Sequence, residues 1–163
     1  MSKVKVYCAC SWFTDSQKIH MDKVYEDLMI NPTVDWENSY RPLDHQYQGI
    51  DICRNPEFLD DEYQRASWLA NTYKNDISGI INSDVGVFAY VPSQETIDDG
   101  MAFELGYMTA IGKPTIVVIP DDKGQEPMNL MIAEGATQVV TLSEFHNMNL
   151  NKVFKRPFDK VVF

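Results

Sequence analysis

Short apolar runs alternate along the chain with longer stretches of helical periodicity, and this alternation constrains the fold more than any other feature. The clearest runs are Val85–Val91 and Thr115–Ile119. The second consists entirely of β-branched residues, which is typical of a central strand in a parallel sheet. Parallel neighbours need a crossover connection, which is usually a helix. The alternation therefore predicts an α/β fold, in which helices cover both faces of a mostly parallel sheet.

The expected elements follow from the same patterns and from the residues that end them. We expect strands at residues 3–10, 33–40, 85–91, 115–119 and 138–140, and helices at residues 15–30, 57–81, 99–111, 128–133 and 142–148. Thr14 or Asp15 is the expected N-cap of the first helix, and residues 42–55 are expected to form a loop. This order predicts a single domain over residues 1–163, with a doubly wound, flavodoxin-like sheet of five strands and flanking helices.

Charge and composition exclude several classes of partner. The net charge is −10 and there is no run rich in lysine or arginine, which argues against a nucleic acid polymer as the ligand. A neutral nucleoside or base needs stacking and hydrogen bonds instead, so it stays compatible with this charge. There is no run of about 18 apolar residues that could span a membrane. The strand-like N-terminus and an odd number of cysteines, three, lead us to expect a cytoplasmic location.

Carboxylates are the remaining candidates for catalytic side chains. Neither a glycine-rich phosphate-binding motif nor a GxSxG motif is present, and the isolated histidines do not predict a metal site. The unusual carboxylate is Glu104, which lies between Phe103 and Leu105 in an otherwise apolar helical turn. Such a position is costly for a charge unless a partner or a substrate uses it. Asp76, Asp98 and Asp99 are the other acids near the expected ends of the strands and helices.

Two carboxylates around a pocket suit the cleavage of a glycosidic bond. One is ionised and attacks or stabilises the sugar, while the other keeps a proton for the leaving group. Aromatic side chains that could pack against a base or a sugar follow the first strand: Tyr7, Trp12 and Phe13. A plainer interpretation also stands, in which Asp98 and Asp99 only cap a helix and Asp76 is a solvated acid. The residues alone leave both interpretations open.

Several blocks of sequence, in the same order, resemble the nucleoside 2-deoxyribosyltransferase family. They include Trp12–Asp15, Glu37–Tyr40, Tyr73–Asp76, Met101–Tyr107 and Met128–Met131. Each block alone is weak evidence for the family, but together the blocks cover nearly the whole chain. The resemblance implies that a 2-deoxyribosyl group passes between purine or pyrimidine bases with retention, through a covalent ester and without a cofactor, in nucleoside salvage.

The resemblance also implies roles for individual residues. Glu104 matches the nucleophile, and Tyr7 matches the tyrosine that orients it. Asp98 matches the acid that binds the base and protonates it, and Asp76 matches a second acid of the pocket. Asp99 is then left as the expected helix cap.

The substrate-binding residues match in the same way. Gln46 matches a residue that contacts the base, and Trp12 and Phe13 match residues that line the cavity. Asn129 and Met131 match residues that reach into the pocket of a neighbouring subunit, where the asparagine holds the 5′-hydroxyl. The family assembles as hexamers, each a trimer of dimers, so the resemblance implies a homo-oligomer.

The chain departs from the family at two places. A turn that contains glycine in the family reads Cys8–Ser11 here, and the usual final tyrosine is Phe163. Base preference therefore stays open between the purine-restricted branch and the branch that accepts both base types, and we favour the second. Two rival functions also remain: a hydrolase of deoxynucleosides or their 5′-monophosphates, and a non-catalytic module that binds nucleosides.

Overall fold

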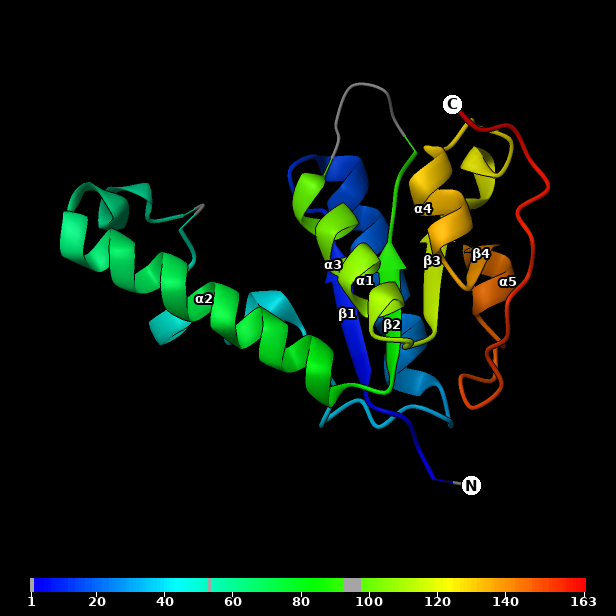
Figure 1. Cartoon of the computed structure of the whole chain (residues 1–163), viewed down its shortest axis with the longest axis horizontal. Helices are drawn as coiled ribbons and strands as arrows, with labels where there is room; N and C mark the ends of the chain where they lie inside the picture. Colours follow the sequence, from blue (N-terminus) through cyan, green and yellow to red (C-terminus); the bar gives the residue numbers. More distant parts are fainter. Residues whose placement is uncertain (1, 53, 93–97) are drawn as a thin grey trace.

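The computed structural model describes residues 2–52, 54–92 and 98–163 (Figure 1). The connection between the expected strand at residues 85–91 and the expected helix at residues 99–111 therefore lies partly outside the described residues, as does Cys53. The sheet has four parallel strands in the order β1-β2-β3-β4. They are β1 (Val6–Cys10), β2 (Val85–Ala89), β3 (Thr115–Ile119) and β4 (Gln138–Thr141). The predicted α/β class and the parallel sheet are confirmed.

The prediction of a fifth strand at residues 33–40 is wrong. This segment runs along the outer edge of β1. It pairs there only through two isolated bridges, Val4↔Val34 just before β1 and Tyr7↔Tyr40 within β1. Between the bridges the hydroxyl of Ser39 accepts the backbone N–H of Val6 at 2.9 Å. A side chain thus takes the place of a backbone carbonyl, and a continuous ladder does not form. The arrangement is that of a flavodoxin-like sheet whose outermost strand is reduced to two bridges.

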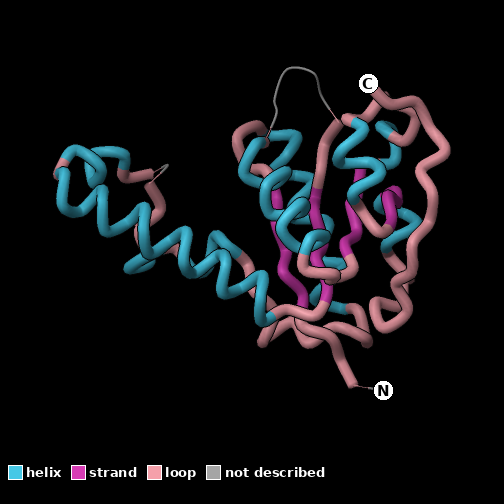
Figure 2. The backbone as a smooth tube through the Cα atoms, in the orientation of Figure 1, coloured by secondary structure: helices cyan, strands magenta, loops and turns pink. Residues whose placement is uncertain are grey.

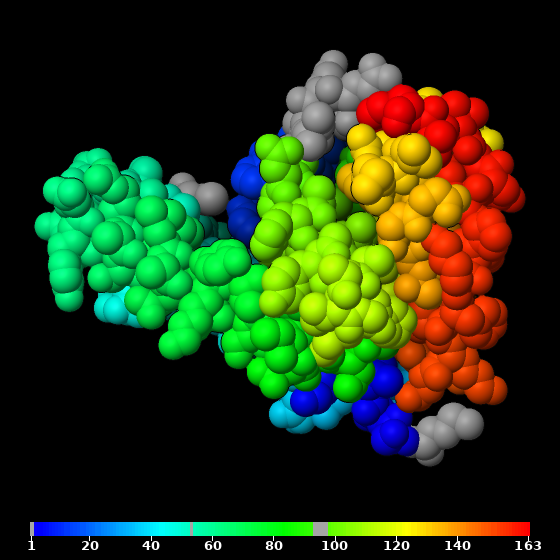
Figure 3. All heavy atoms as spheres, viewed as in Figure 1, coloured from blue at the N-terminus to red at the C-terminus, as the bar shows by residue number. Residues whose placement is uncertain are grey.

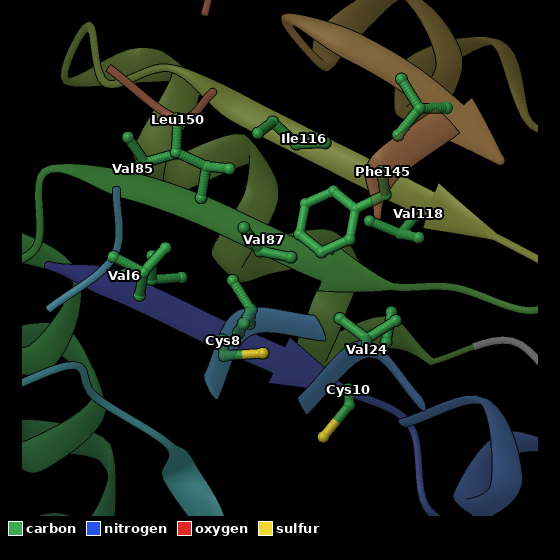
Figure 4. Packing of buried hydrophobic residues seen from close by; sticks show 14 residues of the cluster. Val6, Cys8, Cys10, Val24, Val85, Val87, Ile116, Val118, Phe145 and Leu150 are labelled. Atoms are coloured by element: carbon green, nitrogen blue, oxygen red, sulfur yellow. The ribbon is translucent and has the colours of Figure 1, made fainter. Parts of the chain in front are cut away.

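Helices cover both faces of the sheet, as predicted (Figure 2). Within the described residues the α-helices are α1 (Asp15–Ile30), α2 (Glu62–Asn82), α3 (Asp99–Ala110), α4 (Leu130–Gly135) and α5 (Leu142–Phe145). On one face Val24 and Leu28 of α1 and Phe145 of α5 pack against the strands (Figure 4). On the other face the core is built by residues of α2, α3 and α4.

The alternation of side chains along β1 determines which residues reach each face. Val6, Cys8 and Cys10 point into the core beneath α1 and α5 (Figure 4). Tyr7 and Ala9 point to the opposite face, beneath α2 and α3. The phenol ring of Tyr7 is therefore completely buried, at 0% exposure, on the face where α3 carries Glu104.

The caps of two helices resolve points that the sequence left open or predicted wrongly. Thr14 is the N-cap of α1, and Gln17 completes a capping box with it. Asp98, and not Asp99, caps α3, because the Asp98 carboxylate accepts the backbone N–H of Met101 at 2.9 Å. Two neighbouring acids look alike in sequence, and the one with extended backbone geometry becomes the cap.

Helix α2 stands out from the rest of the molecule (Figures 1 and 3). It begins at Glu62, later than expected, and the residues before it form short 3-10 turns that include Pro42–His45 and Pro56–Asp60. Tyr63 is 80% exposed on its outer part. The C-terminal part of α2 packs on the sheet through Ile80 and so places Asp76 where the helix leaves the body. Among the described residues, every helix is too short or too polar to cross a membrane.

Candidate active site

Tyr7 and Glu104 meet on the face of the sheet that α2 and α3 cover. The Tyr7 hydroxyl donates a hydrogen bond to Oε1 of Glu104 at 2.7 Å. Burial raises the pKa of Glu104 to about 7, the Tyr7 hydrogen bond opposes this rise, and the charges of Asp76 and Asp98 add to it. The pKa of Tyr7 lies far above its ordinary range because the phenol is buried beside carboxylates, so Tyr7 is the donor. Glu104 is therefore poised to change protonation state near neutral pH.

Asp76 is a second carboxyl group with a raised pKa. Burial raises the pKa of Asp76 to about 6, while a hydrogen bond from Tyr40 and the nearby His45 oppose the rise. The Tyr40 hydroxyl donates to Oδ1 of Asp76 at 3.0 Å. Asp76 is thus not a freely solvated acid at the end of a helix. The electrostatic effect of Asp76 on Glu104 links the two carboxyl groups into one site.

Asp98 differs from the other two acids, because both of its oxygens already accept hydrogen bonds. Oδ1 accepts the backbone N–H of Met101, and Oδ2 accepts the hydroxyl of Ser11 at 2.7 Å. Ser11 is only 2% exposed, so this bond is shielded from water. These two hydrogen bonds fix the orientation of the Asp98 carboxylate. Asp76 and Asp98 thus both act electrostatically on Glu104, and the three carboxyl groups form one candidate site.

Comparison with known proteins decides between the families that such a cluster could serve. A family model described as nucleoside 2-deoxyribosyltransferase matches residues 6–132. The chain belongs to this family. It is a family of transferases, so the resemblance stated from the sequence blocks is confirmed.

Individual relatives agree with the family. The chain is 40% identical to a nucleoside deoxyribosyltransferase of Lactobacillus leichmannii, over 93% of each chain. It is 39% identical to one of Lactobacillus johnsonii, over 93% of this chain and 98% of that one. A solved structure of the 2-deoxyribosyltransferase of Bacillus psychrosaccharolyticus matches with a TM-score of 0.68 and 21% identity, over 95% of this chain and 99% of that one. The structural match supports the fold, and the sequence matches carry the family.

The residues expected to form the wall of the cavity differ in exposure. Trp12 is partly buried and packs against the core beneath α1, with its ring 5.7 Å from that of Phe13. Phe13 is 63% exposed, so its ring is free to cover a ligand. The side-chain oxygen Oε1 of Gln46 is buried and has no hydrogen-bond partner among the described residues. A buried oxygen without a partner is unusual in a folded protein.

Asn129 and Met131 lie apart from the pair formed by Tyr7 and Glu104. They line a cavity of about 680 Å³ between α3 and α4, which Asp98 and Phe163 also border. Asn129 caps α4 through a hydrogen bond from the backbone N–H of Met131, and the Met131 side chain is 76% exposed. Tyr7 and Glu104 are absent from the lining of this cavity as the described residues form it. Within one chain, Asn129 and Met131 therefore face a different space from the Tyr7–Glu104 pair.

Two further residues belong to this cluster that we did not select from the sequence, Tyr40 and Ser11. Tyr40 ends the segment that we expected to form a strand at residues 33–40, and its place beside Tyr7 depends on a pairing that the sequence did not show. Ser11 lies in the segment Cys8–Ser11, which we had considered only as a departure from the resemblance, and its hydrogen bond to Asp98 spans 87 positions of sequence. Within the described residues, no group of three or more histidine, cysteine, aspartate or glutamate side chains is placed to hold a metal ion.

Proposed function

We propose that the protein exchanges the nucleobase of 2′-deoxyribonucleosides by double displacement at Glu104, and that residues 1–163 act as one domain in nucleoside salvage. The observation that carries the proposal is the hydrogen bond from buried Tyr7 to Glu104. Tyr7 engages Oε1, which leaves Oε2 of Glu104 to attack C1′ of the sugar. A carboxylate held from one side by a fixed donor is well placed for nucleophilic attack.

The two half-reactions balance with the acids of the cluster. A bond forms from Glu104 to C1′ while the C1′–N bond breaks, and the electron pair leaves with the base, which takes up a proton. A second base then attacks C1′, loses a proton and releases Glu104, so two inversions give retention. The resemblance implied that Asp98 protonates the base. We assign this proton to Asp76 instead, because burial raises the pKa of Asp76 to about 6. Asp98, whose oxygens already accept hydrogen bonds, binds an N–H group of the base.

The remaining residues bind substrate. We assign Trp12 and Phe13 to the wall of the cavity and Gln46 to the base, which would supply a partner for the buried Gln46 oxygen. We assign Asn129 and Met131 to the site of a neighbouring subunit in a hexamer built as a trimer of dimers. The exposure of Met131 and its separation from Glu104 within one chain support that assignment.

Thymidine with and without adenine tests the proposed reaction. With both present, the protein is expected to form deoxyadenosine and thymine at equal rates, measured by chromatography. Without adenine, thymine release is expected to be much slower, because water is expected to attack the covalent deoxyribosyl intermediate more slowly than a base does. Equal release of free deoxyribose with and without adenine would make the protein a hydrolase. No product in either mixture would favour a non-catalytic binding module.

Replacing Ser11 by alanine is expected to weaken the use of acceptor bases. The hydroxyl of Ser11 holds Oδ2 of Asp98, and a hydrogen bond to a charged group is worth about ten-fold or more in binding. We therefore expect KM for the acceptor base to rise by about ten-fold, and KM for the donor nucleoside to rise by less. Ser11→Thr, which keeps a hydroxyl, is expected to retain more of the wild-type preference. Ser16→Ala, at an exposed serine of α1, is the matched control. An unchanged series of acceptor KM values in Ser11→Ala would contradict a role for this hydroxyl.

A further inference from the structure

Tyr40 lies beside Tyr7 at the edge of the sheet. The backbone N–H of Tyr40 donates to the carbonyl of Val6 at 2.7 Å, and that of Cys8 donates to the carbonyl of Tyr40 at 2.9 Å. Tyr7 and Tyr40 are thus direct neighbours in a parallel bridge. Neighbours in a bridge present their side chains to the same face. The two rings accordingly stack, with centroids 5.5 Å apart and planes at 6°.

The hydroxyl groups of the two stacked rings contact two different helices. Tyr7 donates to Glu104 of α3, and Tyr40 donates to Asp76 of α2. Helix α2 stands out from the body of the molecule, so its contacts with the sheet edge determine where Asp76 lies (Figure 1). The tyrosine pair therefore connects the two carboxyl groups through side chains fixed on neighbouring backbone segments.

The ring of Tyr40 is also held on its other sides. A Cβ added to Gly79 of α2 would lie 2.4 Å from Cγ of Tyr40, so the ring occupies space that only a glycine leaves free. The imidazole of His45 stacks on Tyr40 with centroids 4.3 Å apart and planes at 23°. His45 is itself held by a 2.9 Å hydrogen bond between Nδ1 and the carbonyl of Arg41. Tyr40 is thus constrained by Tyr7, Gly79 and His45 as well as by its backbone.

We propose that Tyr40 is a positioning residue of this site, which fixes the Asp76 carboxyl group of α2 relative to the Tyr7–Glu104 pair. The inference rests on the proposed function, because it assigns Tyr40 a part in the same reaction. Neither the sequence blocks nor the relatives assigned Tyr40 a role. Tyr40 acts through Asp76 and does not itself exchange atoms with the substrate. A carboxyl group on a projecting helix needs such an anchor, because small misplacements of a reacting group cost much of its effect.

Tyr40→Phe is the decisive variant, because it keeps the ring and removes only the hydroxyl. We expect kcat to fall by about ten-fold or more while KM for the donor changes by less than about three-fold. The hydroxyl donates to the ionised form of Asp76, so its loss is expected to raise the pKa of Asp76 by about one pH unit. That pKa is read by NMR titration of the Asp76 carboxyl carbon in the ligand-free protein. The ionisable groups that interact with Asp76 are Tyr7, Tyr40, His45 and Glu104.

Tyr25→Phe is the matched control. Tyr25 is a tyrosine that packs against the core on the opposite face of the sheet, and its hydroxyl contacts Cys10 and none of the three carboxylates. This variant is expected to keep wild-type kcat and the wild-type titration of Asp76. Gly79→Ala serves as a second route, since its Cβ displaces the Tyr40 ring without removing any polar group. It is expected to lower kcat and raise the pKa of Asp76 in the same direction, with folding checked by circular dichroism.

The readouts separate failure of the inference from failure of the proposed function. A wild-type protein that transfers no deoxyribose refutes the proposed function, whatever Tyr40 does. In an active protein, a Tyr40→Phe variant with wild-type kcat overturns the inference. An unchanged titration of Asp76 overturns it as well, even if kcat falls, because Tyr40 would then act by another route. Only the fall in kcat together with the shift in the Asp76 titration supports a positioning role.

Discussion

The Glu104→Ala variant is expected to lose deoxyribosyl transfer by at least about a thousand-fold, because no other carboxyl group of the cluster is held by Tyr7. Removal of a nucleophile eliminates the covalent route, and water or a second base must then attack the nucleoside directly. The measurement is the rate of base exchange between thymidine and adenine at saturating concentrations. Loss of a buried carboxylate leaves the strands and the packing of α3 intact, so the variant is expected to fold.

The covalent intermediate offers an independent readout of the same prediction. Donor nucleoside without acceptor is expected to add one deoxyribosyl group to the wild-type protein, seen by intact-mass analysis, and to add none to Glu104→Ala. Glu26→Ala, at an exposed position of α1, is the matched control and is expected to exchange bases and to form the adduct like the wild type. Exchange within a few-fold of wild type in Glu104→Ala would reject Glu104 as the nucleophile. An adduct that persists in that variant would place the ester on another residue.

A strand could be predicted where burial in the sheet determines its sequence pattern. Residues 115–119 are buried on both faces, so their uninterrupted β-branched run matches β3 residue for residue. The segment at residues 33–40 has no such cause, because it borders the sheet on one side only. Its role depends on where Ser39 places a hydroxyl, which periodicity does not encode. Periodicity thus located the four strands of the sheet, but it could not show that residues 33–40 pair with the sheet only through two bridges.

The candidate site divides in the same manner. Glu104 could be selected because a carboxylate in an apolar helical turn has a local cost that is visible in sequence. The partners of the other acids could not be selected by that route. Tyr40 and Asp76 are 36 positions apart, and Ser11 and Asp98 are 87 apart, so only the fold brings them together. The choice of Asp98 over Asp99 as the cap depends on a backbone angle at one residue, which two adjacent acids do not reveal.

The Glu104→Gln variant is expected to be more stable than the wild type at pH 8. Burial raises the pKa of Glu104 from an ordinary 4.5 to about 7, so the folded state holds this proton more tightly than the unfolded state does. Stability therefore falls as pH rises between about 4.5 and 7, because the folded state binds more protons in that window. The corresponding cost at pH 8 is on the order of 3 kcal/mol. Glutamine has no charge to bury, and its side-chain oxygen still accepts the Tyr7 hydroxyl.

Thermal unfolding of both proteins from pH 5 to pH 8, at one protein concentration, measures this effect. We expect a small difference in Tm at pH 5 that grows to about 5 °C or more at pH 8 in favour of Glu104→Gln. A slope between about pH 4 and 6 should remain in both proteins, because burial also raises the pKa of Asp76. Glu26→Gln is the matched control and should follow the wild type. A difference that is constant with pH, or a less stable Glu104→Gln, would contradict the raised pKa. Strongly perturbed pKa values cluster at functional sites, so this measurement tests a property expected of a functional Glu104 by a route independent of activity.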